Sequence, residues 1–134
     1  MSDGKIKRPS KFDSFEHIFI IGPLTLDSFS NRAYIVSSTE IQFTPDEFDT
    51  LQILAAREDV PFTFDQLYSA VWEQDDGRDR RNEAREGIAN IIRHINNAGN
   101  GFIWIEAEPS TGFTLRTRWA HNREKWQETR NDQN

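Results

Sequence analysis

The sequence predicts a single α+β domain in which short strands come first, three helices follow, and a β-hairpin ends the fold. Three observations carry this prediction: strand-like apolar segments between residues 17 and 43, two helix starts of the capping-box type, and an amphipathic segment at 81–98. A length of 134 residues suits one domain with tails, because two hydrophobic cores would be hard to fill from so short a chain.

Strand-like segments occupy the first third of the chain. Residues 17–27, 32–36 and 40–43 are rich in β-prone side chains, and turns rich in serine separate them. Gly22 and Pro23 interrupt the first segment, and a proline suits a strand start or a sheet edge because it has no N–H to donate. We expect an N-terminal antiparallel sheet of three or four short strands.

Two helix starts carry the same signal. The sequence TPDE at 44–47 places a threonine cap before a proline at the first helical position, and its glutamate completes a capping box. The sequence TFDQ at 63–66 repeats the box. Apolar residues recur at helical spacing to about residue 57 in the first helix and through Trp72 in the second. A short extended link at 59–62 is expected between them.

The segment at 81–98 has two unlike faces. Its apolar face carries Ala84, Ile88, Ile91 and Ile95, and its polar face carries Asn82, Arg85, Ala89, Arg93 and Asn96. An apolar back fixes a helix to a core, and a short polar, cationic front suits contact with base edges and phosphates. An ordinary surface helix with solvated arginines shows the same pattern, so both interpretations stay open. Gly87, inside the helix, costs up to about 1 kcal/mol relative to alanine, and the sequence offers no reason for it.

A hairpin pattern follows this third helix. Residues 102–107 and 113–118 are strand-like, and the turn sequence at 109–112 joins them. Two helices that lead into a third, followed by a hairpin, form the winged helix-turn-helix arrangement. The expected division is an N-terminal arm at 1–16, a winged-helix domain at 17–118 and a polar C-terminal tail at 119–134.

Composition and spacing argue against several classes of function. The chain has no cysteine, which excludes disulfides, thiolate metal sites and a cysteine nucleophile. The acidic sequence at 75–77 does not make a calcium loop, since Trp72 stands where the first acidic ligand would be needed. The histidines, His17, His94 and His121, have no paired carboxylate spacing. With no nucleophile elbow and no glycine-rich phosphate loop, we expect no metal, no cofactor and no enzyme activity.

Charge and hydropathy indicate a cytoplasmic protein that does not enter a membrane. The longest apolar run, at 18–26, is interrupted and is far too short to cross a bilayer, and the first residues do not resemble a signal peptide. Hydrophobic residues make up 36% of the chain, which is enough for a packed core. The formal net charge of -6 disfavours nonspecific nucleic-acid binding, although a local basic face can still bind within an acidic molecule.

A succession of motifs resembles one known family. The matching residues are GPLTLD at 22–27, Arg32, FTPDEFDTL at 43–51, Gln66-Leu67, Val71-Trp72, Ile88, Ile91, Ile95 and Gly112-Phe113. Together they cover roughly residues 20–116 and resemble the DNA-binding effector domain of OmpR/PhoB-type response regulators. The family's receiver domain has no counterpart in these residues, so we expect no phosphorylation control by that route.

The resemblance implies how the domain would contact DNA. The third helix, at 81–97, would lie in the major groove with Asn82, Arg85, Ala89, Asn90 and Arg93 facing the bases. Arg80 and Arg81 would contact phosphates, which the positive end of the helix dipole also favours. The wing, formed by Glu108, Pro109, Ser110 and Thr111, would reach the minor groove. The loop at 73–80 would contact RNA polymerase or another regulator, and the protein would bind DNA as a homodimer or in tandem.

The wing departs from the family pattern. The family usually has an Arg-Gly pair before the Gly-aromatic pair, and here Pro109 and Ser110 take that place. Glu106 and Glu108 stand beside them. A carboxylate next to a minor groove is repelled by the phosphates, and the cation that would read the width of the groove is missing.

The second and third helices depart from the pattern as well. Phe64 stands where the family often has a phosphate-contacting arginine, and Glu83 and Glu86 offset part of the positive charge of the third helix. These residues support a second hypothesis, a winged helix that binds proteins and has lost or weakened its DNA binding. The DNA hypothesis requires the polar face of 81–98 to stay open to solvent and not to be ringed by carboxylates.

Overall fold

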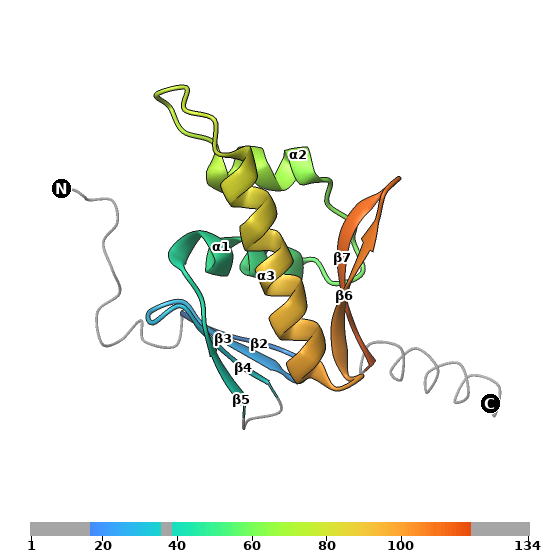
Figure 1. Ribbon diagram of the computed structural model, residues 1–134. Coiled ribbons are helices and arrows are strands. Elements are labelled where there is room, and N and C mark those ends of the chain that lie inside the picture. The colour runs from blue at the N-terminus through green and yellow to red at the C-terminus, as the bar shows by residue number, and fades with distance from the viewer. Residues whose placement is uncertain (1–16, 36–38, 119–134) are drawn as a thin grey trace, which may run out of the picture.

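The computed structural model describes residues 17–35 and 39–118 (Figure 1). Its elements are β2 (Ile18–Ile21), β3 (Leu24–Asp27), β4 (Arg32–Ile35), β5 (Thr39–Gln42), α1 (Pro45–Ala56), α2 (Phe64–Leu67), the π-helical turn η2 (Tyr68–Trp72), α3 (Arg81–Gly99), β6 (Ile103–Glu108) and β7 (Gly112–Thr117). The predicted α+β winged helix, with its N-terminal sheet, three helices and hairpin, is confirmed. The predicted arm at 1–16 and tail at 119–134 lie outside the described residues.

The N-terminal sheet has the order β2-β3-β4-β5, and all its neighbouring strands are antiparallel. Its inner side chains, among them Leu24, Leu26 and Ile35, are completely buried. They join the core formed by α1, α3 and the hairpin, since the sheet lies against one end of α3 and beside α1 (Figure 1). None of the helices in the described part of the chain is long and apolar enough to cross a membrane.

Both capping boxes form as predicted. The Thr44 hydroxyl accepts from the backbone N–H of Glu47 at 3.2 Å, and the Glu47 carboxylate accepts from the backbone N–H of Thr44 at 3.1 Å. Thr63 and Gln66 make the same reciprocal pair at 3.1 and 2.8 Å. These contacts satisfy backbone donors that a helix start otherwise leaves free, which fixes where α1 and α2 begin.

The second helix is not the regular helix that its spacing predicts. After one turn of α2 the backbone widens into η2, where the N–H of Glu73 donates to the carbonyl of Tyr68, five residues back, at 2.8 Å. Such wide turns are rare and occur mostly as single turns. Here the turn ends with Trp72 buried between α1 and α3, and its indole N–H donates to the Thr50 hydroxyl at 3.1 Å.

The packing of Trp72 explains the glycine inside α3. A Cβ added at Gly87 would lie 2.5 Å from Cη2 and 2.8 Å from Cζ2 of the indole ring. Any side chain at this position would push the ring out of its place or move α3 away from it. Glycine at position 87 lowers the helix propensity of α3, but it allows close contact between α3 and η2.

The extended link predicted at 59–62 pairs with the hairpin. The N–H of Asp59 donates to Leu115 O at 2.9 Å, and Phe62 and Phe113 exchange backbone hydrogen bonds at 2.9 and 2.7 Å. The link approaches the hairpin so closely that a Cβ on Gly112, whose φ is +112°, would meet Phe62 O at 2.1 Å. Glycine at this position thus allows the wing to join the body of the domain.

Gly87→Ala tests the close packing of α3 on η2. Helix propensity alone would stabilise this variant by roughly 1 kcal/mol, whereas overpacking against a buried ring costs about 1–3 kcal/mol. We expect urea denaturation to give a lower free energy of unfolding for Gly87→Ala than for the wild type. Ala89→Gly, on the exposed side of the same helix, measures how much the difference in helix propensity between alanine and glycine changes the free energy of unfolding. A Gly87→Ala protein more stable than the wild type would contradict the packing argument.

Candidate nucleic-acid interface

Helix α3 has the two faces that the sequence predicts. Ala84, Ile88, Ile91 and Ile95 are buried in the core. The side chains exposed on the other side are those of Asn82, Arg85, Glu86, Ala89, Arg93 and Asn96. The polar face is thus open to solvent rather than covered by the described residues.

Two arginines lie on the flank of α3 that faces α2. The guanidinium carbon of Arg81 lies 4.8 Å from the centre of the Tyr68 ring, and its Nη1 lies 3.6 Å from Asp79. The guanidinium carbon of Arg85 lies 5.0 Å from the centre of the Phe64 ring, and its Nη1 donates to the Asn82 side chain at 3.2 Å. This flank of α3 therefore presents positive charge.

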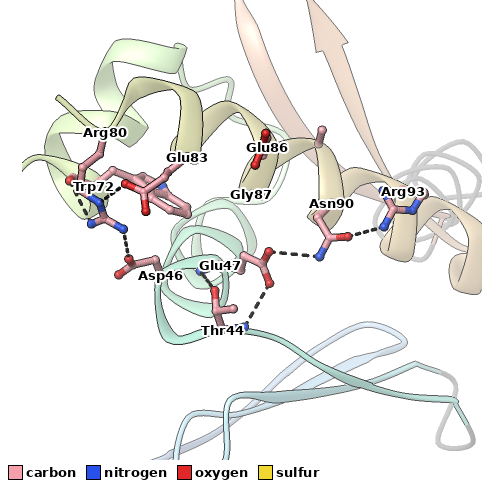
Figure 2. A pocket seen from close by; sticks show the side chains of 11 residues that line it. Thr44, Asp46, Glu47, Trp72, Arg80, Glu83, Glu86, Gly87, Asn90 and Arg93 are labelled. Carbon is pink, nitrogen blue, oxygen red and sulfur yellow. Dashed lines mark hydrogen bonds and ion pairs between the residues drawn. The ribbon is translucent and has the colours of Figure 1, made fainter.

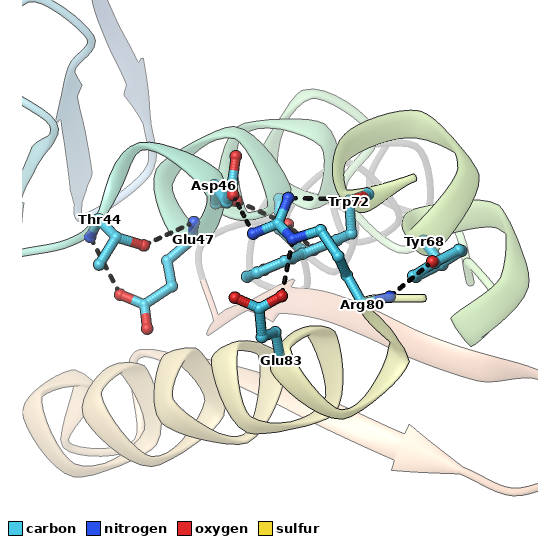
Figure 3. A network of polar contacts seen from close by, with 8 residues as sticks. Thr44, Asp46, Glu47, Tyr68, Trp72, Arg80 and Glu83 are labelled. Carbon is cyan, nitrogen blue, oxygen red and sulfur yellow. Dashed lines mark hydrogen bonds and ion pairs between the residues drawn. The ribbon is translucent and has the colours of Figure 1, made fainter. Parts of the chain in front are cut away.

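Arg80, the neighbour of Arg81, has a different environment. Its side chain is 11% exposed, and it donates to Glu83 at 2.8 Å, to Asp46 at 2.9 Å and to the backbone carbonyl of Trp72 at 3.2 Å (Figure 3). The hydrogen bonds to Glu83 and Asp46 raise the pKa of Arg80, and the bond from Arg80 lowers the pKa of Glu83. Its guanidinium joins α1, η2 and α3.

Asn90 and Arg93 belong to a second network, which starts at the first helix cap (Figure 2). One oxygen of Glu47 accepts from the backbone N–H of Thr44, and the other accepts from the Asn90 amide at 3.1 Å. The Asn90 carbonyl oxygen in turn accepts a hydrogen bond from Arg93. Asn90 thus uses both ends of its amide within the chain and orients Arg93, which remains exposed.

A cleft of about 620 Å³ separates the start of α1 from α3 (Figure 2). Its lining includes four carboxylates, those of Asp46, Glu47, Glu83 and Glu86, and two guanidiniums, those of Arg80 and Arg93. Asp46 and Glu83 pair with Arg80, and Glu47 is bonded to Asn90. Carboxylates therefore line the flank of α3 that faces α1, and the flank that faces α2 carries Arg81 and Arg85. The polar face is bordered by acidic groups on one side and is not ringed by them.

The start of α3 uses its first backbone donors within the chain. The N–H of Arg80 donates to the Tyr68 hydroxyl at 3.0 Å, and the N–H of Arg81 donates to the Asp79 side chain at 3.0 Å. The loop at 73–80 precedes this start and projects from the body of the domain (Figure 1). Its acidic residues Glu73, Asp75, Asp76 and Asp79 are exposed.

The wing carries one paired and one exposed carboxylate. Glu106 accepts from Arg116 at 2.9 Å and from the Trp104 indole at 3.1 Å, and the bond to Glu106 raises the pKa of Arg116. Glu108, Pro109, Ser110 and Thr111 are exposed at the tip. No cation stands among these four residues, as the sequence indicates.

Asn96 has a role that its position on the polar face does not predict. Its amide donates to the carbonyl of Ile105 at 3.2 Å, and its carbonyl oxygen accepts from the N–H of Ile105 at 2.7 Å. This reciprocal pair holds β6 against α3. The wing and the third helix are therefore fixed relative to each other by a side chain on α3.

Residues 38–115 match the protein family described as "Transcriptional regulatory protein, C terminal". The chain belongs to this family. The resemblance to OmpR/PhoB-type effector domains is therefore confirmed. No curated protein matches the sequence.

Several solved structures share the fold of this effector domain. The DNA-binding domain of E. coli CadC is 16% identical with a TM-score of 0.59, over 72% of this chain and 88% of that one. The DNA-binding domain of the response regulator AdeR, solved in complex with an intercistronic region, is 12% identical with a TM-score of 0.59, over 74% and 99%. DrrB, a Thermotoga maritima OmpR/PhoB homologue, is 18% identical with a TM-score of 0.58, over 79% of this chain and 49% of its own.

Some residues that hold the side chains of α3 in place cannot be recognised from the sequence. Phe64 and Tyr68 are visible in the sequence as apolar residues four positions apart, but nothing in the sequence shows that arginines of α3 lie over their rings. Glu47 is visible as part of a capping box, and its bond to Asn90 bridges 43 positions of sequence. A signal for such pairs exists only once the helices are placed against each other.

A pair of neighbouring substitutions separates the two roles of the arginines. Arg80→Gln removes a guanidinium that bonds to three groups, and it leaves Asp46 and Glu83 without their cation. We expect a Tm lower by several degrees in a thermal melt. Arg81→Gln, which breaks a loose contact to Asp79 and an exposed contact with the Tyr68 ring, is the matched control and should lower the Tm far less than Arg80→Gln. Equal melting temperatures of the two variants would contradict the assigned roles.

Proposed function

We propose that this effector domain regulates transcription by binding double-stranded DNA with sequence preference. In this proposal α3 lies in the major groove, which admits an α-helix, and the hairpin wing lies near the minor groove. The single observation that carries the proposal is the solvent-open face of α3, with Arg81, Arg85 and Arg93 exposed on it. Membership of a transcriptional regulatory family and the AdeR complex with an intercistronic region support it.

The proposed contacts differ in kind along α3. Arg85 and Arg93 contact base edges or phosphates through in-plane N–H groups, and Arg81 contacts a phosphate near the start of the helix. Asn82 is exposed beside Arg85, and the methyl group of Ala89 offers an apolar surface of the kind that contacts a thymine methyl.

Two residues first grouped with these contacts support them instead. Asn90 bonds to Glu47 and to Arg93, so we propose that it acts on DNA through the orientation of Arg93. Arg80 has its donors occupied by three groups of the chain, so we propose that it fixes α3 and touches no phosphate. The wing residues 108–111 then approach the minor groove without a cation of their own.

The proposal extends to two kinds of partner. Binding as a homodimer or in tandem would place α3 of each copy in successive major grooves, which are about 34–36 Å apart. The loop at 73–80 is exposed, acidic and close to the start of α3, which suits contact with RNA polymerase or another regulator.

A second candidate function is favoured by one specific observation. Carboxylates line the cleft between α1 and α3, and Glu108 is exposed at the wing tip. An acidic surface of this kind repels DNA and suits a basic segment of a partner protein. In this alternative the winged helix is an interaction module in which DNA binding has been lost or weakened.

A salt titration with duplex DNA separates the two functions. Duplexes are first selected from a random library, and Kd is then measured over a range of salt concentrations. If Arg81, Arg85 and Arg93 each contact a phosphate, the logarithm of the association constant should fall with the logarithm of the salt concentration. The expected slope is about −3, since each neutralised phosphate contributes about −0.9. We expect Arg85→Ala and Arg93→Ala each to weaken binding by about tenfold. Arg78→Ala, an exposed arginine in the loop before α3, is the control and should have little effect.

Two results would overturn the DNA proposal. One is the recovery of no binding duplex at low salt, which would favour the interaction module. The other is an equal loss of affinity in Arg78→Ala and Arg85→Ala, which would mean that the domain responds to overall charge and not to the face of α3.

A further inference from the structure

Three aromatic rings follow one another along α2 and η2 at intervals of four residues, and each lies against an arginine near the start of α3. The distances from ring centre to guanidinium carbon are 5.0 Å for Phe64 and Arg85, 4.8 Å for Tyr68 and Arg81, and 5.2 Å for Trp72 and Arg80. The Phe64 and Tyr68 rings also stack on each other, 6.0 Å apart at an angle of 25°. Rings four residues apart share one helix face, so the three rings form a row along α2 and η2 that faces the arginines of α3.

A guanidinium held over a ring keeps its hydrogen-bonding edge free. The attraction acts between the ring face and the planar cation, and the N–H groups of arginine lie in the plane of that cation. An arginine loses considerable rotamer freedom when it binds a ligand. A ring that holds the side chain beforehand reduces that loss and fixes the direction in which the donors point.

The three arginines differ in how many donors remain for a ligand. Arg80 donates to Glu83, Asp46 and the Trp72 carbonyl, so its donors serve the fold. Within the described residues Arg81 has a loose contact with Asp79, and Arg85 has one hydrogen bond to Asn82. Arg81 and Arg85 therefore combine a fixed position with donors that remain for a ligand.

We infer that Phe64 and Tyr68 are positioning residues that hold Arg85 and Arg81 ready for phosphate oxygens of a DNA strand at the edge of the major groove. The inference rests on the proposed DNA binding. Both arginines lie on the flank of α3 toward α2, away from the centre of its outward face, where the backbone and not the base edges would pass. An aromatic residue at position 64 thus contributes to phosphate binding through a cation supplied by another helix.

Phe64 is also partly buried against the core, so its replacement changes packing as well as the contact to Arg85. The test therefore uses Phe64→Leu, which keeps an apolar side chain and removes the ring, and Phe64→Tyr, which restores a ring. Phe62→Leu is the matched control, because Phe62 is a partly buried ring on the same core that carries no arginine among the described contacts. Arg85→Ala and the double variant Phe64→Leu/Arg85→Ala complete a cycle.

The first readout is the Kd for a selected duplex at fixed salt. We expect Phe64→Leu to weaken binding about two- to fivefold, and Phe64→Tyr and Phe62→Leu to bind like the wild type. We also expect the double variant to bind no more weakly than Arg85→Ala alone. If Phe64→Leu weakens DNA binding by the same factor in the Arg85→Ala protein as in the wild type, the inference is overturned, because the ring then acts independently of the arginine.

The second readout needs no DNA. In proton NMR spectra of the free protein, the δ and ε protons of Arg85 should be shifted upfield by the ring current of Phe64, and the shift should disappear in Phe64→Leu and return in Phe64→Tyr. Absence of the shift in the wild type would overturn the positioning role whatever the DNA result. A wild type that shows the shift but binds no duplex would instead contradict the proposed function, and with it the role of the row in phosphate binding.

Discussion

The contact of the Trp72 indole with Gly87 is the constraint on which the rest of the domain depends. It brings η2 within van der Waals contact of α3 at Gly87, where the missing Cβ lets the indole ring approach the helix backbone. The indole N–H bonds to Thr50 of α1, and the guanidinium of Arg80 lies over the same ring while it bonds to Asp46 and Glu83. One side chain thus sets the positions of three helices, and the direction of the outward face of α3 follows from them.

The same packing divides charge across α3. Its flank toward α1 meets the acidic cap of that helix, where Asp46 and Glu47 lie. Its flank toward α2 meets aromatic rings, over which Arg81 and Arg85 lie. A polyanion would therefore be attracted on one side of the helix and repelled on the other, which gives it a preferred direction of approach. This asymmetry is how a chain with a net charge of -6 can offer a basic surface.

How much could be predicted from the sequence depends on how local each interaction is. The capping boxes at Thr44 and Thr63, the isoleucine face of α3 and the hairpin involve residues close together in the chain, and the sequence predicts them. Arg80 and Arg81 are adjacent and chemically identical, and what separates them is the set of partners that Arg80 bonds to, of which Asp46 lies 34 positions away. The reason for Gly87 lies in Trp72, fifteen positions earlier, across a widened turn that helical spacing does not reveal. Patterns thus predict which face of α3 is open, and only tertiary packing shows which of its cations are available.

The most direct test of this asymmetry is a titration of the isotope-labelled protein with a selected duplex, followed in ¹H–¹⁵N NMR spectra. The account predicts that the largest shift changes fall on the side-chain and backbone signals of Arg81, Arg85 and Arg93 and on the start of α2. It predicts small changes for Asp46, Glu47 and their neighbours at the start of α1. Changes centred on Asp46, Glu47 and the start of α1, or spread evenly over both flanks of α3, would contradict it.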